Sequence, residues 1–257
     1  MSIKFTILGC GYSLGVPRID GNFGKCDPKN IKNHRTRCSA LISTNTKNIL
    51  IDTSPDLKHQ LIKNNVKNID KVFYTHMHAD QTHGINDLRF FYLKNRVKLP
   101  IYADIPTQKY LISAFKYCFK KTSEYPPTLK MNNLKNIYNL KDGKNKINLK
   151  AIKVKHGKID SICYIINNKC AYASDVSDIT NKNLRLFNNL NYLVIDCLRE
   201  TSHYSHYNLY DILNLIKDIK PKKTILTNLD NSMDYESLKK KLPNNIVPAY
   251  DGMSFYL

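Results

Sequence analysis

A short apolar strand that runs straight into a cluster of metal-binding residue types is the feature that most constrains this chain. Residues 71–75 read Lys-Val-Phe-Tyr-Thr, and the next nine read His76-Met77-His78-Ala79-Asp80-Gln81-Thr82-His83-Gly84. Alternate side chains of extended backbone point the same way, so His76, His78 and Asp80 would share one side. Imidazole nitrogens and carboxylate oxygens suit borderline divalent metals. Because three of the chain's eight histidines fall here, we interpret the segment as a metal site rather than as a polar surface turn.

Two later segments also place a ligand-type residue directly after an apolar strand. Val154-Lys155-His156-Gly157 does so with a histidine, and Ala171-Tyr172-Ala173-Ser174-Asp175 with an aspartate. Taken alone, each is more often an ordinary loop residue. Following the first segment in this order, His156 and Asp175 become candidates for a third and a bridging ligand.

The alternation of short strands and helices predicts an α/β fold. Strand patterns cover residues 4–8, 40–44, 49–52, 72–74, 147–154, 161–166, 170–173, 192–196, 224–227 and 254–257. Helical patterns cover residues 56–64, 107–119, 183–187, 209–217 and 235–241. This order fits two sheets with helices outside them. Without a repeat or a flexible linker, the sequence predicts a single domain over residues 1–257.

The ligand-type residues, taken in order, resemble the metallo-β-lactamase superfamily of hydrolases. The resemblance lies in His76-Met77-His78-Ala79-Asp80, then His156, then Ser174-Asp175. Softer segments are similar to the PhnP-like phosphodiesterase branch: the stretches 9–17, 35–39, 50–54, 194–197 and 250–253. The match runs nearly end to end.

This resemblance implies a four-layer αββα sandwich of two mixed β-sheets flanked by helices, with a metal site at the sheet edges. The first ion would be held by His76, His78 and His156, with Asp175 bridging to a second ion. The second site would use Asp80, the residue at 81 and a late-strand residue. There the family usually has histidines, whereas this chain has Gln81 and Asn228.

The two amides weaken the implied second site. Amide oxygens are neutral and poorer donors than imidazole for zinc. Three outcomes stay open: one ion, a second site for a harder ion such as Mn²⁺, or an inactive protein. Because both replacements are amides on the same site, we favour the first two together, and the expected cofactor is Zn²⁺ or Mn²⁺.

Other residues are candidates for supporting roles. His206 matches a family position that helps protonate the leaving group, although a capping or exposed histidine is an equal alternative. Asp80 could orient the nucleophile. His83 and Asp52 could each brace a ligand histidine. Phosphate contacts are expected from guanidinium groups, which grip two oxygens at once; the candidates are Arg35, Arg37 and Arg89.

The expected activity is hydrolysis of a small, perhaps cyclic, phosphodiester by metal-bound hydroxide. The alternative within enzymes is a ribonuclease Z-like tRNA-processing nuclease, although no glycine-rich arm insertion is visible. The alternative outside enzymes is a binding protein with a degraded second site. The resemblance leaves a homodimer open.

Composition says more about the cellular location of the protein than about its binding partner. The net charge of +19 would suit nucleic acid or phosphate esters. The lysines are dispersed through every segment, so we favour compositional bias and do not favour a nucleic-acid partner. Seven scattered cysteines without a CxxC pair argue against a disulfide framework. No apolar run of membrane-spanning length and no secretory pattern occur, so a cytoplasmic location is expected.

Overall fold

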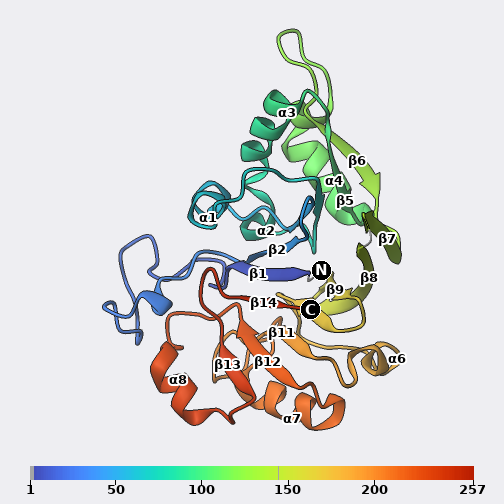
Figure 1. Cartoon of the computed structure of the whole chain (residues 1–257). Coiled ribbons are helices and arrows are strands. Elements are labelled where there is room, and N and C mark those ends of the chain that lie inside the picture. The colour runs from blue at the N-terminus through green and yellow to red at the C-terminus, as the bar shows by residue number, and fades with distance from the viewer. Residues whose placement is uncertain (1–2, 144) are drawn as a thin grey trace.

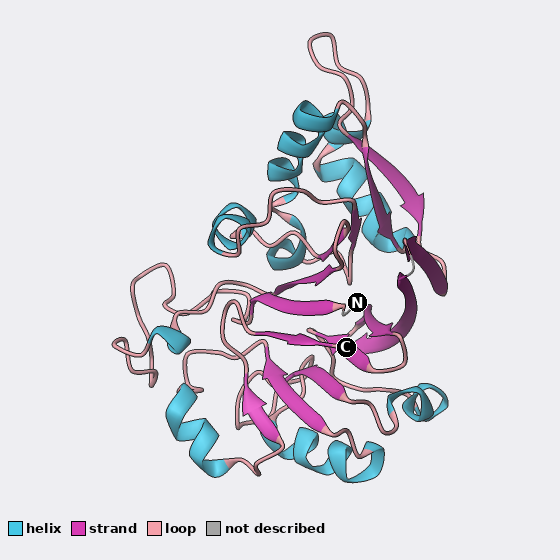
Figure 2. Cartoon of the chain, in the orientation of Figure 1, coloured by secondary structure: helices cyan, strands magenta, loops and turns pink. Residues whose placement is uncertain are grey.

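Two facing β-sheets with helices on their outer sides form the fold of the chain. The computed structural model describes residues 3–143 and 145–257, and in this part each sheet has seven strands. Helices of the first half of the chain lie beyond one sheet and helices of the second half beyond the other (Figure 1). The same four layers are visible when the chain is coloured by secondary structure (Figure 2). The αββα sandwich that the resemblance implied is therefore confirmed.

The first sheet has the order β14-β1-β2-β3-β4-β5-β6, and the second has the order β13-β12-β11-β10-β9-β8-β7. The strands of the first half are β1 (Lys4–Gly9), β2 (Ser39–Ser43), β3 (Asn48–Ile51), β4 (Lys71–Phe73), β5 (Leu99–Ala103), β6 (Leu129–Asn133) and β7 (Ile137–Asp142). Those of the second half are β8 (Asn145–His156), β9 (Ile159–Ile166), β10 (Cys170–Ala173), β11 (Tyr192–Asp196), β12 (Lys223–Thr227), β13 (Ile246–Pro248) and β14 (Ser254–Tyr256). Strands β3 to β6 are parallel to one another, as are β10 to β13. Both sheets also contain antiparallel pairs, so both are mixed.

The helices connect the parallel strands. They are α1 (Leu57–Lys63), α2 (Ala79–Thr82), α3 (Arg89–Asn95), α4 (Ile105–Ala114), α5 (Lys116–Phe119), α6 (Asn181–Leu184), α7 (Leu209–Ile219) and α8 (Tyr235–Lys241), with 3-10 turns η1 (Ile31–Asn33), η2 (Ile85–Leu88) and η3 (Arg185–Phe187). Helix α7 begins with a capping box, in which Asn208 and Asp211 satisfy each other's backbone N–H groups. In the described part of the chain, no helix is long and apolar enough to cross a membrane.

Aromatic side chains fill the space between the two sheets. Phe5 of the first sheet meets Tyr172 of the second with ring centroids 5.7 Å apart, and Phe73 meets Tyr164 at 5.8 Å. All four side chains are buried. Since Phe73 ends β4, this packing fixes the place where the chain leaves the strand toward His76.

Several strands were not predicted from the sequence. Strand β7 alternates between exposed and half-buried residues and is rich in lysine and asparagine, so it lacks an apolar signal. Strand β5 contains Pro100, which lacks the backbone donor of a central strand. The helix expected over residues 107–119 is two helices, because the backbone at Phe115 leaves the helical region between α4 and α5.

Candidate metal centre

The candidate residues gather where strands of both sheets end. His76 and His78 follow β4, and His156 is the last residue of β8. Asp175 follows β10 by two residues, and Asn228 directly follows β12. The sequence therefore places ligand types at strand ends, and the sandwich brings those ends together.

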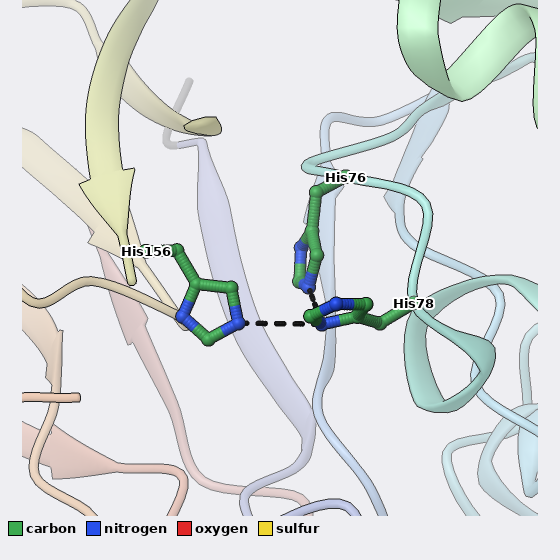
Figure 3. Close-up of side chains that lie close together, drawn as sticks. All are labelled: His76, His78 and His156. Atoms are coloured by element: carbon green, nitrogen blue, oxygen red, sulfur yellow. Dashed lines mark hydrogen bonds between the residues drawn. The ribbon is translucent and has the colours of Figure 1, made fainter. Parts of the chain in front are cut away.

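Three imidazoles meet at one point between the sheets. Nε2 of His76 lies 3.0 Å from Nδ1 of His78, which lies 3.3 Å from Nε2 of His156 (Figure 3). The rings pack edge to face, with centroids between 4.6 and 5.1 Å apart. Convergence of three ring nitrogens is the donor arrangement of a zinc-type site.

The outer nitrogen of His156 is held by the backbone. Its Nδ1 lies 2.7 Å from the carbonyl oxygen of Ser205, an acceptor, so Nδ1 carries the hydrogen. The inner Nε2 then keeps its lone pair for a metal. Gly157, at φ +59°, permits this contact because a Cβ there would approach the Cβ of Ser205 to 2.8 Å.

The outer nitrogen of His76 is held by a buried side-chain relay. Its Nδ1 is 3.0 Å from the Thr75 hydroxyl, which donates to Asp52 Oδ2 over 2.8 Å. The Thr75 backbone N–H donates to Asp52 Oδ1 over 2.7 Å. Asp52 is fully buried, and burial raises the pKa of its carboxyl well above the usual range. Asp52 thus reaches His76 through Thr75, a link that the sequence did not reveal.

The three imidazoles are neutral at physiological pH. Burial lowers the pKa of His76 to about 3 and lowers the pKa values of His78 and His156. A neutral imidazole with its lone pair turned inward is the form that binds a metal. The donor set therefore fits the divalent ion that the fold implies.

Gln81 connects two carboxylates at the adjoining side of the centre. Its Nε2 lies 3.2 Å from Asp80 Oδ2 and 3.0 Å from Asp175 Oδ2. The reverse orientation of the amide would set its oxygen against both carboxylates. The Gln81 Oε1 is buried and has no hydrogen-bond partner among the described residues.

Asn228 makes a similar connection on the other side of Asp175. Its Nδ2 donates to Asp175 Oδ1 over 3.2 Å and to Asp196 Oδ1 over 3.3 Å. Asp175 therefore receives an amide N–H at each of its two oxygens. Burial would raise the pKa of Asp175, but the neighbouring histidines lower it below its usual value.

Asp80 stands slightly apart from the histidines. Among the described residues, the donor atoms that lie within 4.8 Å of one another belong to His76, His78 and His156, and to His156, Asp175 and His206. Burial, together with the charge of Asp175, raises the pKa of Asp80 to about 7. Asp80 can therefore exchange a proton near neutral pH.

His206 forms an ion pair with Asp196. Nδ1 of His206 lies 2.6 Å from Asp196 Oδ2, and the imidazole is largely buried. Burial alone would lower the pKa of His206, but the Asp196 carboxylate raises it to about 9. Asp196 lies at the end of β11 and was not predicted as a site residue. The pattern of an aspartate at a strand end, ten residues before a histidine, was the available signal.

A cavity of about 350 Å³ opens over this centre. His78, Asp80, His156, Asp175, His206 and Asn228 line it, together with Arg199 and His203. Figure 3 shows how the histidines of the two sheets point toward one another. The cavity therefore joins the candidate ligands to basic groups of the loop after β11.

The arginines that were predicted to bind phosphate, Arg35, Arg37 and Arg89, do not line this cavity. Arg35 is 2% exposed and donates to the carbonyls of Met233 and Asp230 at 2.7 and 3.2 Å, so it is a brace between loops. Arg37 forms a two-point ion pair with Asp56, and Arg89 stacks on the ring of Tyr125. Neither Arg37 nor Arg89 lines the cavity. The basic residue that does is Arg199, which sequence reasoning passed over.

The predicted bracing role of His83 is also wrong. Its Nε2 lies 2.6 Å from the hydroxyl of Tyr110, and the residue is exposed directly after the end of α2. A helix begins after His78, so the alternation that placed the histidines on one side ends there.

Comparisons with known proteins agree with this geometry. The family model described as beta-lactamase superfamily domain matches residues 47–227. The crystal structure of a new diphosphatase from the PhnP family superposes with a TM-score of 0.90 at 28% identity, covering 100% of this chain and 98% of that one.

Two curated relatives match by sequence. An octanoyltransferase of Porphyromonas gingivalis is 28% identical over 258 residues, covering 98% of this chain and 51% of that protein. A ribonuclease Z of Prochlorococcus marinus is 28% identical over 163 residues, covering 62% of this chain and 48% of that protein. The chain therefore spans about half the length of the curated relatives it matches.

Proposed function

Because this chain belongs to the β-lactamase superfamily domain family, in the PhnP-like branch of the metallo-β-lactamase hydrolases, we propose that it hydrolyses small phosphodiesters with one tightly held divalent ion. The observation that carries this proposal is the meeting of three neutral imidazoles beside a carboxylate whose two oxygens are both occupied by amide N–H groups.

The proposed ligands are His76, His78, His156 and Asp175. Three nitrogens and one carboxylate oxygen match the donor types of zinc sites, with Mn²⁺ as the alternative ion. When bound, the ion would supply the Lewis acidity that activates water and neutralises charge on the phosphoryl oxygens. The carbonyl of Ser205 and the hydroxyl of Thr75 hold two of the rings ready for it.

The two amides support a single ion. In the implied two-ion site, Asp80 and Asp175 would both contact the second ion. Here the NH₂ group of Gln81 donates to both carboxylates, and the NH₂ group of Asn228 donates to Asp175 as well. These hydrogen bonds occupy oxygens of both carboxylates without a second positive ion. We therefore propose one ion per chain, which is the first of the three outcomes that the sequence left open.

Two side chains are proposed to move protons. Asp80 lines the cavity beside the histidines and, with a pKa of about 7, can accept a proton from the attacking water. His206 is held protonated by Asp196 and lines the same cavity, so it can donate a proton to the leaving oxygen. Asp196 does not reach the substrate and is a positioning residue.

The test is metal content combined with turnover of bis-p-nitrophenyl phosphate. The zinc-loaded protein should release p-nitrophenolate, and His78→Ala should lose both the ion and the activity. His59→Ala is the matched control, because His59 is an exposed histidine of α1. A wild-type protein that binds no transition metal and shows no turnover with zinc or manganese would leave a non-catalytic binding protein as the answer.

A tRNA-processing nuclease is the second candidate function. It is favoured by the match to a ribonuclease Z over 62% of this chain. Cleavage of a precursor tRNA at its 3′ trailer, at a rate exceeding that for bis-p-nitrophenyl phosphate, would support this candidate over the first. The octanoyltransferase relative is about twice as long as this chain, so its name carries no argument for acyl transfer here.

A further inference from the structure

A lysine in the turn between β8 and β9 lies beside the three metal-binding histidines. Lys158 is the second residue after His156, the last residue of β8. It lines a second cavity, of about 410 Å³, that also reaches His78 and His156. It lines a third cavity as well, of about 250 Å³, on the side of His76. Lys158 and Ile159 are the residues that these two cavities share, so Lys158 lies where both meet next to the proposed metal ligands.

The backbone that carries Lys158 is held on both sides of the turn. His156 pairs with Ile159 across the hairpin, which leaves Gly157 and Lys158 as a two-residue turn. Gly157 has φ +59°, and a positive φ at the first turn position is what tight hairpin turns require. The N–H of Gly157 also donates to the Ser177 hydroxyl over 3.0 Å. The base of the Lys158 side chain therefore keeps a fixed position relative to His156.

Lys158 differs from the two lysines before it on β8 in having no acidic partner. Lys153 and Lys155 both pair with Asp160, at 3.3 and 2.7 Å. Asp104, another carboxylate of the third cavity, caps the start of α4. Lys158 is exposed and takes part in no ion pair within residues 3–143 and 145–257. Its positive charge is therefore available to an anion that binds at the histidines.

A centre with one ion needs a further positive group near the phosphate. In phosphoryl transfer, negative charge spreads over the oxygens that neither enter nor leave, and cationic groups aimed at them lower the barrier. Here the amide N–H groups of Gln81 and Asn228 face carboxylates in place of a second ion. His206 is assigned to the leaving oxygen. The second cavity places Lys158 on the remaining side of the histidines.

The geometry points to Lys158 as a catalytic residue that donates a hydrogen bond to a non-bridging oxygen of the cleaved phosphate. An ammonium has three donors on a flexible stem, so it can follow that oxygen as the phosphate changes shape. Lys158 forms no covalent bond and keeps its protons. The proton of the attacking water still goes to Asp80, and the leaving oxygen still receives its proton from His206. This assignment rests on the proposed function, because it assumes that the cleaved phosphate lies at the three histidines.

The test compares matched lysine-to-methionine variants of the zinc-loaded protein. Lys158→Met keeps the length of the stem and removes the charge. It should lower kcat/KM for bis-p-nitrophenyl phosphate about 10- to 100-fold, as expected for one hydrogen bond between charged groups. Lys155→Met is the matched control, because it removes the same charge from the same hairpin and Lys155 lines neither cavity. It should keep the wild-type kcat/KM.

Two further readings separate a contact with phosphate from a structural role. Zinc content should be the same in the wild type and in both variants, because neither lysine is a proposed ligand. Lys158→Arg keeps the positive charge and should recover most of the activity that Lys158→Met loses. An unchanged kcat/KM in Lys158→Met, an equal fall in Lys155→Met, or a loss that Lys158→Arg does not reverse would overturn the assignment.

Binding of dimethyl phosphate, an unreactive diester, gives a measurement that does not depend on hydrolysis. Isothermal titration calorimetry should show that Lys158→Met binds this diester about tenfold more weakly than the wild type, whereas Lys155→Met binds it equally well. Equal affinities in the wild type and Lys158→Met would count against the contact. A wild type that binds dimethyl phosphate but shows no turnover would instead overturn the proposed function.

Discussion

Replacing Thr75 with valine tests whether the buried relay behind His76 sets the affinity for the metal. The Thr75 hydroxyl lies between Nδ1 of His76, at 3.0 Å, and Oδ2 of Asp52, at 2.8 Å. Thr75 is 1% exposed, so water cannot replace its hydroxyl. Valine has nearly the same shape and removes the two side-chain hydrogen bonds while leaving the packing in place.

The expected loss of zinc affinity follows from the hydrogen bonds that remain in the variant. The backbone N–H of residue 75 still donates to Asp52 Oδ1 over 2.7 Å, so the carboxyl keeps one of its two hydrogen bonds. A buried acceptor left unsatisfied costs about 1–3 kcal/mol of folding free energy. Loss of the group that orients a ligand histidine weakens metal binding by roughly 10- to 100-fold. Thr75→Val should therefore bind zinc at least about tenfold more weakly.

The assay is competition for zinc with a chromogenic chelator, together with urea unfolding of the metal-free protein. Thr75→Ser is the matched control, because serine keeps the hydroxyl and should stay within a few-fold of the wild-type zinc affinity. If Thr75→Val binds zinc as tightly as the wild type, then the relay does not hold His76 and the reasoning is wrong.

Two further predictions concern the groups around His206 and His156. In Asp196→Asn, the pKa of His206 should fall from about 9 toward its ordinary value, because burial lowers it and only the more weakly acting Asp175 and Asp80 still raise it. A general acid must be protonated, so kcat/KM for a diester with an alkyl leaving group should fall about tenfold at about pH 7.5 and recover near about pH 6; an equal loss at both pH values would show a structural role only. In Gly157→Ala, the new Cβ would meet Ser205 at 2.8 Å on backbone at φ +59°, which should lower the free energy of unfolding by about 1–3 kcal/mol and weaken zinc binding. Urea unfolding and chelator competition measure both effects, and wild-type values would show that the Ser205 contact is dispensable.

The sequence predicted the three histidines of the site because the signal there is local. His76 and His78 follow one apolar strand with the spacing of extended backbone, and His156 ends another. Their meeting required only that strand ends gather at one edge, which the αββα arrangement provides. The roles of Gln81 and Asn228 could be questioned from sequence, but their donation to Asp175 is visible only in three dimensions.

The basic residues show where sequence reasoning fails. Arg35 and Arg199 look alike in a sequence, yet one is enclosed by backbone carbonyls and the other lines the cavity. Likewise, Asp196 becomes important only because His206 folds back onto it across ten residues. Long-range contacts of loops leave no periodic pattern, whereas strands and helices do. Strand β7 was missed for a different reason. Its residues alternate between exposed and half-buried, and too few of them are apolar for the strand to be detected.

The central claim is that the amides Gln81 and Asn228 leave this centre with one ion. Native mass spectrometry of the zinc-loaded protein, with metal analysis of the same sample, counts ions per chain directly. We predict one ion in the wild type, and two in the double variant Gln81→His/Asn228→His, which adds two imidazole donors beside Asp175. Two tightly bound ions in the wild type would contradict the account.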